Sequence, residues 1–159
     1  MKNIIAIIWD FDKTLIDGYM QDPIFEDYNV DAHKFWTEVN ALPKKYETEQ
    51  HVKVNPDTIY LNQFIKYAKN GTFKDLNNAK LKEYGKRQNF YAGIPEIFKH
   101  TKEMLKNDAV CEEYNIKVEH YIVSTGFAEV VRGTELMKYV ENIWGCELIE
   151  DDDRKCINE

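Results

Sequence analysis

Two carboxylates and a hydroxyl follow an apolar run near the start of the chain. Residues 4–8 read Ile-Ile-Ala-Ile-Ile, and Asp10, Asp12 and Thr14 come shortly after them. A short run rich in β-branched residues is typical of a strand buried on both faces of a parallel sheet. Side chains two residues apart on an extended chain point the same way, so we expect the three polar groups to share one side of a site.

The pairing of two carboxylates limits the chemistry that such a site can do. Like charges this close repel each other unless a cation or a shared proton relieves them, so the pair indicates a divalent metal site or an acid/base pair. A cluster that offers only oxygen ligands favours Mg²⁺ over softer metals. The structural alternative is a strand followed by a plain acidic turn, because Asp is also common in turns.

A second apolar run ends in polar residues much later in the chain. His120-Tyr121-Ile122-Val123 is followed by Ser124, Thr125 and Gly126, and then by apolar residues at helical spacing. This pattern predicts a strand, a tight turn and the start of a helix. Backbone N–H groups at a helix start can hold an anion such as phosphate. A capped helix start without a ligand is the alternative for this stretch alone.

The run Asp10-Phe11-Asp12-Lys13-Thr14-Leu15 resembles the first motif of the haloacid dehalogenase (HAD) superfamily, Asp-x-Asp-x-Thr, and the strand that ends at Ser124 resembles the second. The resemblance is nearest to the phosphoserine-phosphatase-like branch. It implies an α/β fold with a Rossmann-like parallel sheet core and an inserted helical cap. Lys13 stands where many members have Gly, and we interpret it as a solvated turn residue.

The same resemblance implies a role for each motif residue. Asp10 would be the nucleophile that attacks a phosphoryl group, Asp12 the general acid and base, and both would hold Mg²⁺, Asp12 through its backbone carbonyl. Ser124 would donate its hydroxyl to the transferring phosphoryl group, with the backbone amides of Thr125 and Gly126 nearby. The function implied is a Mg²⁺-dependent phosphatase that forms an aspartyl phosphate and acts on a small phosphorylated metabolite.

The third and fourth motifs of the superfamily, a Lys and a later acidic pair, have no convincing counterpart. Lys155 and the acids Asp151–Asp153 are of the right types, but the Lys follows the acids instead of preceding them. We interpret this stretch as a solvated tail, because charge runs are usually exposed. We therefore expect the chain to lack the C-terminal part of the usual fold. A site with fewer acidic ligands should hold Mg²⁺ weakly.

The domain organisation follows from where the periodicity changes. Residues 1–17 and 93–159 are expected to form the α/β core, and residues 18–92 the helical cap. Within the cap, helices are predicted from an Asp31 cap to Pro43, from an Asn55 cap to Gly71 and from Phe73 to Tyr84. In the core, a helix is predicted from Pro95 to Asn107, a polar connection over 111–118, and a further short strand within 143–149.

Composition excludes several kinds of partner. The formal net charge is −7 and no cluster of Lys and Arg is present, which argues against nucleic acid or an anionic membrane as the main partner. No stretch approaches the length of a membrane span. The three cysteines form no Cys-x-x-Cys pair, and we interpret them as free thiols in a reducing cytoplasm. The four histidines lack ligand spacing and are expected to be structural or exposed.

A different function class stays open at this point. A non-catalytic module that binds phosphate and Mg²⁺, or a receiver-like signalling module, would also place acids after a first strand and a hydroxyl after a later one. A receiver is disfavoured because it carries no helical insertion of this length and keeps its phospho-acceptor on a different strand. The absence of placeable third and fourth motifs keeps the binding-only alternative open.

Overall fold

The computed structural model describes residues 3–159, which divide into two compact units. The sheet unit contains the residues up to Met20 and Leu81–Glu147. The helical unit contains Gln21–Lys80 and Leu148–Glu159. Both units are therefore built from two separate stretches of the chain.

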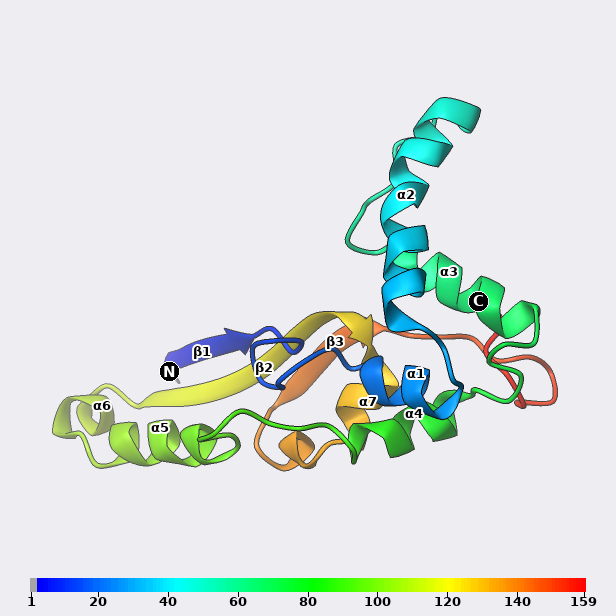
Figure 1. Ribbon diagram of the computed structural model, residues 1–159. Helices are drawn as coiled ribbons and strands as arrows, with labels where there is room; N and C mark the ends of the chain where they lie inside the picture. The colour runs from blue at the N-terminus through cyan, green and yellow to red at the C-terminus, as the bar shows by residue number, and fades with distance from the viewer. Residues whose placement is uncertain (1–2) are drawn as a thin grey trace. The chain divides into compact units, whose positions relative to one another are not determined.

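The sheet unit is built on three parallel strands (Figure 1). The strands are β1 (Asn3–Trp9), β2 (Ile116–Phe127) and β3 (Asn142–Cys146), in the spatial order β1-β2-β3. Trp9 lies beside Ile122 in the ladder, and Val123 lies beside Trp144. The α/β class with a parallel sheet is confirmed, and the carboxyl ends of the strands meet at one edge.

Helix α5 packs on one face of this sheet through an aromatic and histidine cluster. The Phe98 ring lies 5.4 Å from Trp9 and 4.9 Å from His120, centroid to centroid. His120 is fully buried; its Nδ1 accepts from Trp9 Nε1 at 3.0 Å, and its Nε2 lies 2.8 Å from Thr101 Oγ1. Burial lowers the pKa of His120, and the residue is part of the core, in keeping with the expectation that the histidines are structural or exposed. The unit's other helices are α6 (Ala109–Glu113), α7 (Ala128–Gly133) and the 3₁₀ turn η1 (Glu135–Lys138), and α5 itself spans Glu96–Lys106.

The prediction that the first strand is buried on both faces is wrong. Ile4, Ile5 and Ile8 are 47%, 47% and 65% exposed. Among residues 3–159, β1 pairs with β2 alone, so it is an edge strand, and exposed side chains occur on both of its faces, Ile4 and Ile8 on one and Ile5 on the other. The strand itself was predicted correctly, but its apolar side chains are not covered by other elements within residues 3–159.

The helical unit has an aromatic core. The rings of Phe25 and Phe35 lie 4.9 Å apart, and those of Phe64 and Phe73 stack at 4.7 Å. All four side chains are buried. The helices that supply and surround them are α1 (Asp22–Asp27), α2 (Ala32–Gln50), α3 (Ile59–Lys69) and α4 (Asn78–Gly85), the last of which runs on into the sheet unit.

The helices of this unit begin or end at different residues from those predicted. Asp31 does cap α2, accepting from the Lys34 N–H at 3.0 Å, but Pro43 lies inside the helix instead of ending it. The proline removes one backbone hydrogen bond, and the turns beyond it are held by Tyr46, whose hydroxyl accepts from Lys66 Nζ at 2.7 Å.

Local side-chain capping explains the shifted starts of α3 and α4. The Asn55 side chain accepts from the Asp57 N–H at 2.8 Å, which forms a turn, and α3 begins only at Ile59. The Asn77 side chain accepts from the Lys80 N–H at 2.9 Å and so starts α4 at Asn78 instead of Phe73. The side chains of Asn55 and Asn77 bind backbone N–H groups, and each helix therefore starts later in the chain than predicted.

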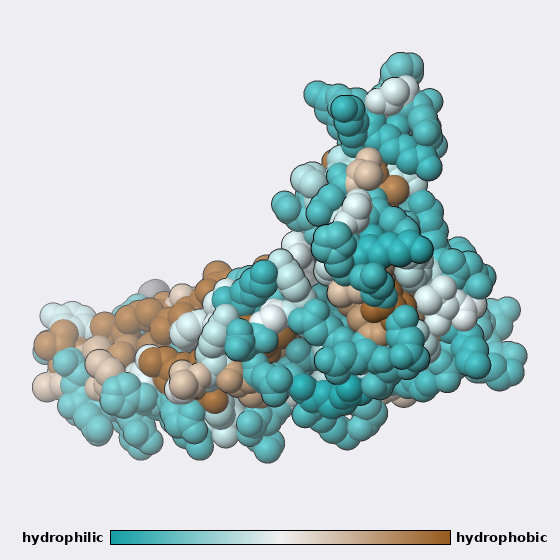
Figure 2. All heavy atoms as spheres, viewed as in Figure 1, coloured by the Kyte–Doolittle hydropathy of each residue, from teal (hydrophilic) through white to brown (hydrophobic). Residues whose placement is uncertain are grey.

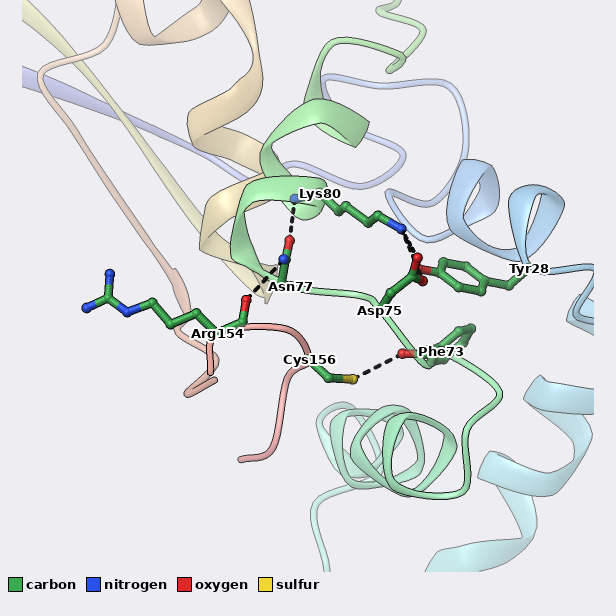
Figure 3. Close-up of polar contacts among 7 residues, drawn as sticks. All are labelled: Tyr28, Phe73, Asp75, Asn77, Lys80, Arg154 and Cys156. Atoms are coloured by element: carbon green, nitrogen blue, oxygen red, sulfur yellow. Dashed lines mark hydrogen bonds and ion pairs between the residues drawn. The ribbon is translucent and has the colours of Figure 1, made fainter. Parts of the chain in front are cut away.

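The charged side chains Asp152–Lys155 are exposed, as predicted, but the C-terminal segment is not a free tail, because it folds into the helical unit. Ile157 is 2% exposed and donates its backbone N–H to the Leu76 carbonyl at 2.7 Å. Figure 3 shows the neighbouring contacts: Asn77 Nδ2 donates to the Arg154 carbonyl at 3.2 Å, and Cys156 Sγ lies 3.1 Å from the Phe73 carbonyl. The buried Ile157, which follows the charged residues, therefore holds this segment against the helical unit.

A polar cluster on the same unit is also drawn in Figure 3. Asp75 accepts from Tyr28 at 2.6 Å and from Lys80 Nζ at 2.5 Å. The hydrogen bonds from Lys80 and Tyr28 lower the pKa of Asp75. The three cysteines are free thiols, as predicted. Within residues 3–159, every helix is too short or too polar to cross a bilayer.

Candidate active site

The loop after β1 turns its polar residues outward over a buried anchor. The Phe11 carbonyl accepts the N–H groups of Thr14, Leu15 and Ile16 at 2.9–3.3 Å, which closes a tight turn. Phe11 and Leu15 are fully buried. Asp12 is half-buried, whereas Thr14 and Asp10, which precedes the turn, are exposed. The buried apolar residues therefore hold the backbone that carries the carboxylates of Asp10 and Asp12.

Lys13 takes the backbone conformation that explains why glycine is common at this position of the motif. Its φ is 57°, in the left-handed region that L side chains rarely adopt. Its N–H donates to the Gly18 carbonyl at 3.1 Å, and its Nζ donates to the Tyr19 hydroxyl at 2.9 Å. The side chain is exposed, as the interpretation of a solvated turn residue expects.

A second stretch of chain holds the loop from the other end. Asp17 donates its N–H to the Asn89 carbonyl at 2.8 Å, and Tyr91 donates its N–H to the Leu15 carbonyl at 3.1 Å. Ile16 forms an antiparallel bridge with Phe90 between these bonds. The loop that carries Asp10 and Asp12 is therefore fixed at both ends.

Each carboxylate receives a hydrogen bond from within the loop. Thr14 Oγ1 donates to Asp10 Oδ2 at 3.2 Å, and the Met20 N–H donates to Asp12 Oδ1 at 2.8 Å. Such bonds fix the orientation of the carboxylate side chains. Each carboxylate has two oxygens, so both retain capacity for a further ligand.

Ser124 lies within β2, which continues to Phe127 through an irregular stretch of its ladder with β3, so the tight turn predicted after Val123 is absent. Ser124 Oγ accepts the N–H of Gly126 at 2.9 Å, so the amide that the resemblance places near phosphate is engaged locally. The hydroxyl keeps its own proton for donation. Gly126 is buried, and a Cβ there would lie 2.5 Å from the Met20 sulfur and 3.2 Å from Ser124 Oγ. A larger residue at this position would require the Met20 side chain to shift.

Met20 connects the two motifs. Its N–H donates to Asp12, while its sulfur accepts the N–H of Phe127 at 3.0 Å and lies against Gly126. The ladder agrees with this contact, because Trp9 lies beside Ile122, so Asp10 and Ser124 follow neighbouring strands. Sequence reasoning missed Met20, since an apolar residue in a loop carries no motif signal.

The remaining residues considered from the sequence lie elsewhere. Thr125 is exposed, and its carbonyl accepts from Cys146 Sγ at 3.3 Å in the same part of β2. Asp151 and Lys155 belong to the helical unit, where Asp151 Oδ1 accepts the Lys155 N–H at 2.7 Å within a local turn. Lys155 Nζ pairs with Asp153 at 2.8 Å. Asp151 and Asp153 therefore bind groups of their own segment.

Asp10 and Asp12 are the oxygen donors available to Mg²⁺ at this site. Across residues 3–159, no group of three or more His, Cys, Asp or Glu side chains could hold a metal ion. Mg²⁺, however, retains several waters and is often bound by one or two carboxylates together with phosphate oxygens. Asp10 and Asp12 supply two oxygen donors of this kind, so the residues present fit the ion in that mode.

Sequence comparison finds one curated relative of the chain and no matching family. No protein-family model matches the chain. An uncharacterized protein of Borreliella burgdorferi is 36% identical over 149 residues, which are 94% of this chain and 51% of that protein. This chain therefore spans about half the length of its curated relative.

Solved structures resemble the chain over almost its whole length. A phospho-aspartyl intermediate analogue of phosphoserine phosphatase matches with a TM-score of 0.61 and 22% identity, over 99% of this chain and 62% of that chain. A substrate-bound phosphoserine phosphatase complex matches with a TM-score of 0.61 and 20% identity, over 100% and 62%. A HAD family hydrolase from Salmonella enterica matches with a TM-score of 0.57 and 15% identity, over 98% and 44%. The chain has the fold of these hydrolases.

Proposed function

We propose that this chain, which has the HAD hydrolase fold, provides the nucleophile and the acid/base group of a phosphatase that hydrolyses a small phosphomonoester. The observation that carries the proposal is the exposed Asp10 at the carboxyl end of β1, with Asp12 two residues later and Ser124 on the neighbouring strand. Carboxylates in this place and order are suited to phosphoryl transfer.

In the first step, an Asp10 carboxylate oxygen attacks phosphorus and the bond from phosphorus to the ester oxygen breaks. Asp12, in its protonated form, gives its proton to the leaving alkoxide. The products are the alcohol and a phosphate carried on Asp10. The Thr14 hydrogen bond supports this role of Asp10 because it fixes one carboxylate oxygen and leaves the other to attack.

In the second step, water attacks the phosphorus of the aspartyl phosphate and the bond to Asp10 breaks. Asp12 takes a proton from this water, so both groups return to their starting states with release of inorganic phosphate. Ser124 donates its hydroxyl proton to a phosphoryl oxygen in both steps. The Met20 amide keeps the Asp12 side chain in one orientation between them.

Asp10 and Asp12 would hold Mg²⁺, which when bound offsets the negative charge of the phosphoryl group. The helical insertion, predicted at residues 18–92, would act as a cap that limits access of water during transfer. The change of compact unit after Met20 and again at Leu81 supports an inserted element. The three free thiols support a reducing cytoplasmic location.

The experiment measures release of inorganic phosphate from a panel of phosphomonoesters, with and without Mg²⁺. The proposal expects Mg²⁺-dependent turnover that Asp10→Asn abolishes. Asp17→Asn is the matched control, because Asp17 is an exposed carboxylate of the same loop. Unchanged turnover in Asp10→Asn would remove the nucleophile assignment.

A second candidate is a module that binds phosphate and Mg²⁺ without turnover. It is favoured by one observation, that the acids near Asp10 within residues 3–159 do not form a cluster of three. Calorimetric titration with inorganic phosphate separates the candidates. Binding that depends on Asp10 and Ser124, without release of phosphate from any ester, would support the module.

A further inference from the structure

Gln88 follows the end of α4 and binds the residue that holds the proposed acid/base group. Its side-chain Nε2 donates to the Met20 carbonyl at 3.3 Å and to the Tyr84 carbonyl at 3.1 Å. Met20 in turn donates its backbone N–H to Asp12 at 2.8 Å. The amide of Gln88, the backbone of Met20 and the carboxylate of Asp12 therefore form one connected series of hydrogen bonds. All four residues belong to the sheet unit.

The end of α4 gives this series a fixed base. Gly85 is buried, and a Cβ there would lie 2.7 Å from the Gly133 Cα of α7, so the two helices meet backbone to backbone. Leu81 and Tyr84 are buried as well. Figure 2 shows mainly hydrophilic side chains over the part of the surface where Figure 1 places α4, which fits a helix whose apolar side chains face inward. The Tyr84 carbonyl therefore holds the Gln88 side chain at a fixed point.

The contact with Met20 depends on the side chain of residue 88, whereas the next contact along the chain does not. The backbone carbonyl of Asn89 accepts the Asp17 N–H at 2.8 Å. A substitution of Gln88 that removes its donor can therefore release the Met20 carbonyl and leave this neighbouring backbone bond in place.

We propose that Gln88 is a positioning residue for proton transfer by Asp12, an inference that rests on the proposed function. Gln88 acts through Met20, because the bond to the Met20 carbonyl limits movement of the Met20 N–H that orients Asp12. A general acid must lie within hydrogen-bond distance of the leaving oxygen, and misplacement by about 1 Å can cost about 10²-fold in rate. Asp10 is oriented separately by Thr14. Loss of the Gln88 donor should therefore impair protonation of the leaving group and spare the attack on phosphorus.

The test compares kcat/KM for an alkyl phosphomonoester and for p-nitrophenyl phosphate. Nitrophenolate leaves without a proton, so the general acid of the first step matters for the alkyl ester alone. Gln88→Met keeps the length of the side chain and removes the donor. It is expected to lower kcat/KM about tenfold or more for the alkyl ester, and less than about twofold for p-nitrophenyl phosphate. In the Asp12→Asn background, the same change is expected to have no further effect on the alkyl ester.

The matched control is Gln63→Met. Gln63 is also half-buried and donates its Nε2 to Glu38 at 2.9 Å, but it lies in the helical unit. The control therefore loses one comparable hydrogen bond, and it is expected to keep the parent ratio of kcat/KM between the two esters.

A second measurement follows the Met20 amide directly and needs no turnover. In Gln88→Met, the Met20 N–H is expected to exchange with solvent deuterium about tenfold faster than in the parent, because its carbonyl side is released. The Asp17 N–H, which is bound to the Asn89 carbonyl, is expected to keep its parent rate.

Two outcomes would overturn the role of Gln88 while the parent turns over both esters. The first is a Gln88→Met variant that lowers kcat/KM equally for both esters, or no more than Gln63→Met does for either. The second is an unchanged exchange rate of the Met20 amide. A parent that releases phosphate from no ester would instead overturn the proposed function, and the role of Gln88 with it.

Discussion

Met20 donates its backbone N–H to a carboxylate oxygen of Asp12 at 2.8 Å. The side chain of the same residue packs into the other half of the site, where its sulfur accepts the Phe127 N–H and lies so close to Gly126 that a Cβ there would displace it. One buried residue therefore sets the position of the proposed acid/base group relative to Ser124.

The first prediction concerns the Met20 side chain. Met20 is fully buried, so Met20→Ala is expected to lower the free energy of unfolding by about 2–5 kcal/mol through the cavity it leaves. Met20→Leu keeps the volume and should cost less than about 1.5 kcal/mol. Urea denaturation measures both. Equal stability of the alanine variant and the parent would contradict the packing described for Met20.

The second prediction tests the contact between Met20 and Gly126. Gly126→Ala alone should destabilise the protein by about 1–3 kcal/mol, because the new methyl group meets the Met20 sulfur. In the Met20→Ala background the same change should cost markedly less, since that sulfur is gone. A double-mutant cycle with a coupling energy near zero would show that the two residues act independently.

The third prediction separates the roles of Asp12. Asp12→Asn keeps an oxygen that can accept the Met20 N–H, so the fold should be unchanged, but it cannot carry a proton. Turnover of a phosphomonoester is expected to fall about 10²- to 10⁴-fold. Steady-state kinetics beside the Asp17→Asn control measures this. A variant that turns over at the parent rate would exclude Asp12 as the acid/base group.

The fourth prediction is a pH dependence of stability from His120. Burial, and next the charge of Lys102, lower its pKa in the folded protein, whereas the unfolded chain titrates near pH 6.5. The unfolded state then binds the proton more readily, so this stabilisation is complete above about pH 6.5 and is lost as the pH falls below it. Denaturation between pH 5 and about pH 7.5 should show the loss, and His120→Gln should flatten that part of the curve. A parent curve that stays level over this range would contradict the assignment.

The sequence predicted the fold class and the order of the site elements because both depend on local patterns. The apolar run before Asp10 and the one before Ser124 form parallel strands whose ends meet, as expected. Burial of the first strand was not predictable in this way. It depends on what covers Ile4 and Ile8, which is a property of other segments and not of the strand itself.

Tertiary contacts also explain the failures in the helical unit. Pro43 has the local signature of a helix end, but contacts at Tyr46 hold the turns that follow it. The charged stretch after Glu150 has the signature of a tail, yet Ile157 anchors it by burial. Met20, likewise, gains its significance only from residues about a hundred positions away.

The fifth prediction follows from that anchor. Ile157→Ala should destabilise the protein by about 2–5 kcal/mol, because its side chain is buried. Ile149→Ala makes the same chemical change in the same segment at a side chain that is 61% exposed, and should cost less than about 0.5 kcal/mol. Thermal unfolding compares the two. Similar losses in both variants would mean that residue 157 is not the anchor.

The phosphate on Asp10 is the intermediate on which the proposed function rests, and it can be measured. The chain is incubated with a phosphomonoester and Mg²⁺, quenched in acid, reduced with borohydride and digested for peptide mass spectrometry. The account predicts conversion of Asp10 to homoserine in the parent and in Asp17→Asn. Reduction at a different carboxylate, or turnover of the ester without any reduction at Asp10, would contradict it.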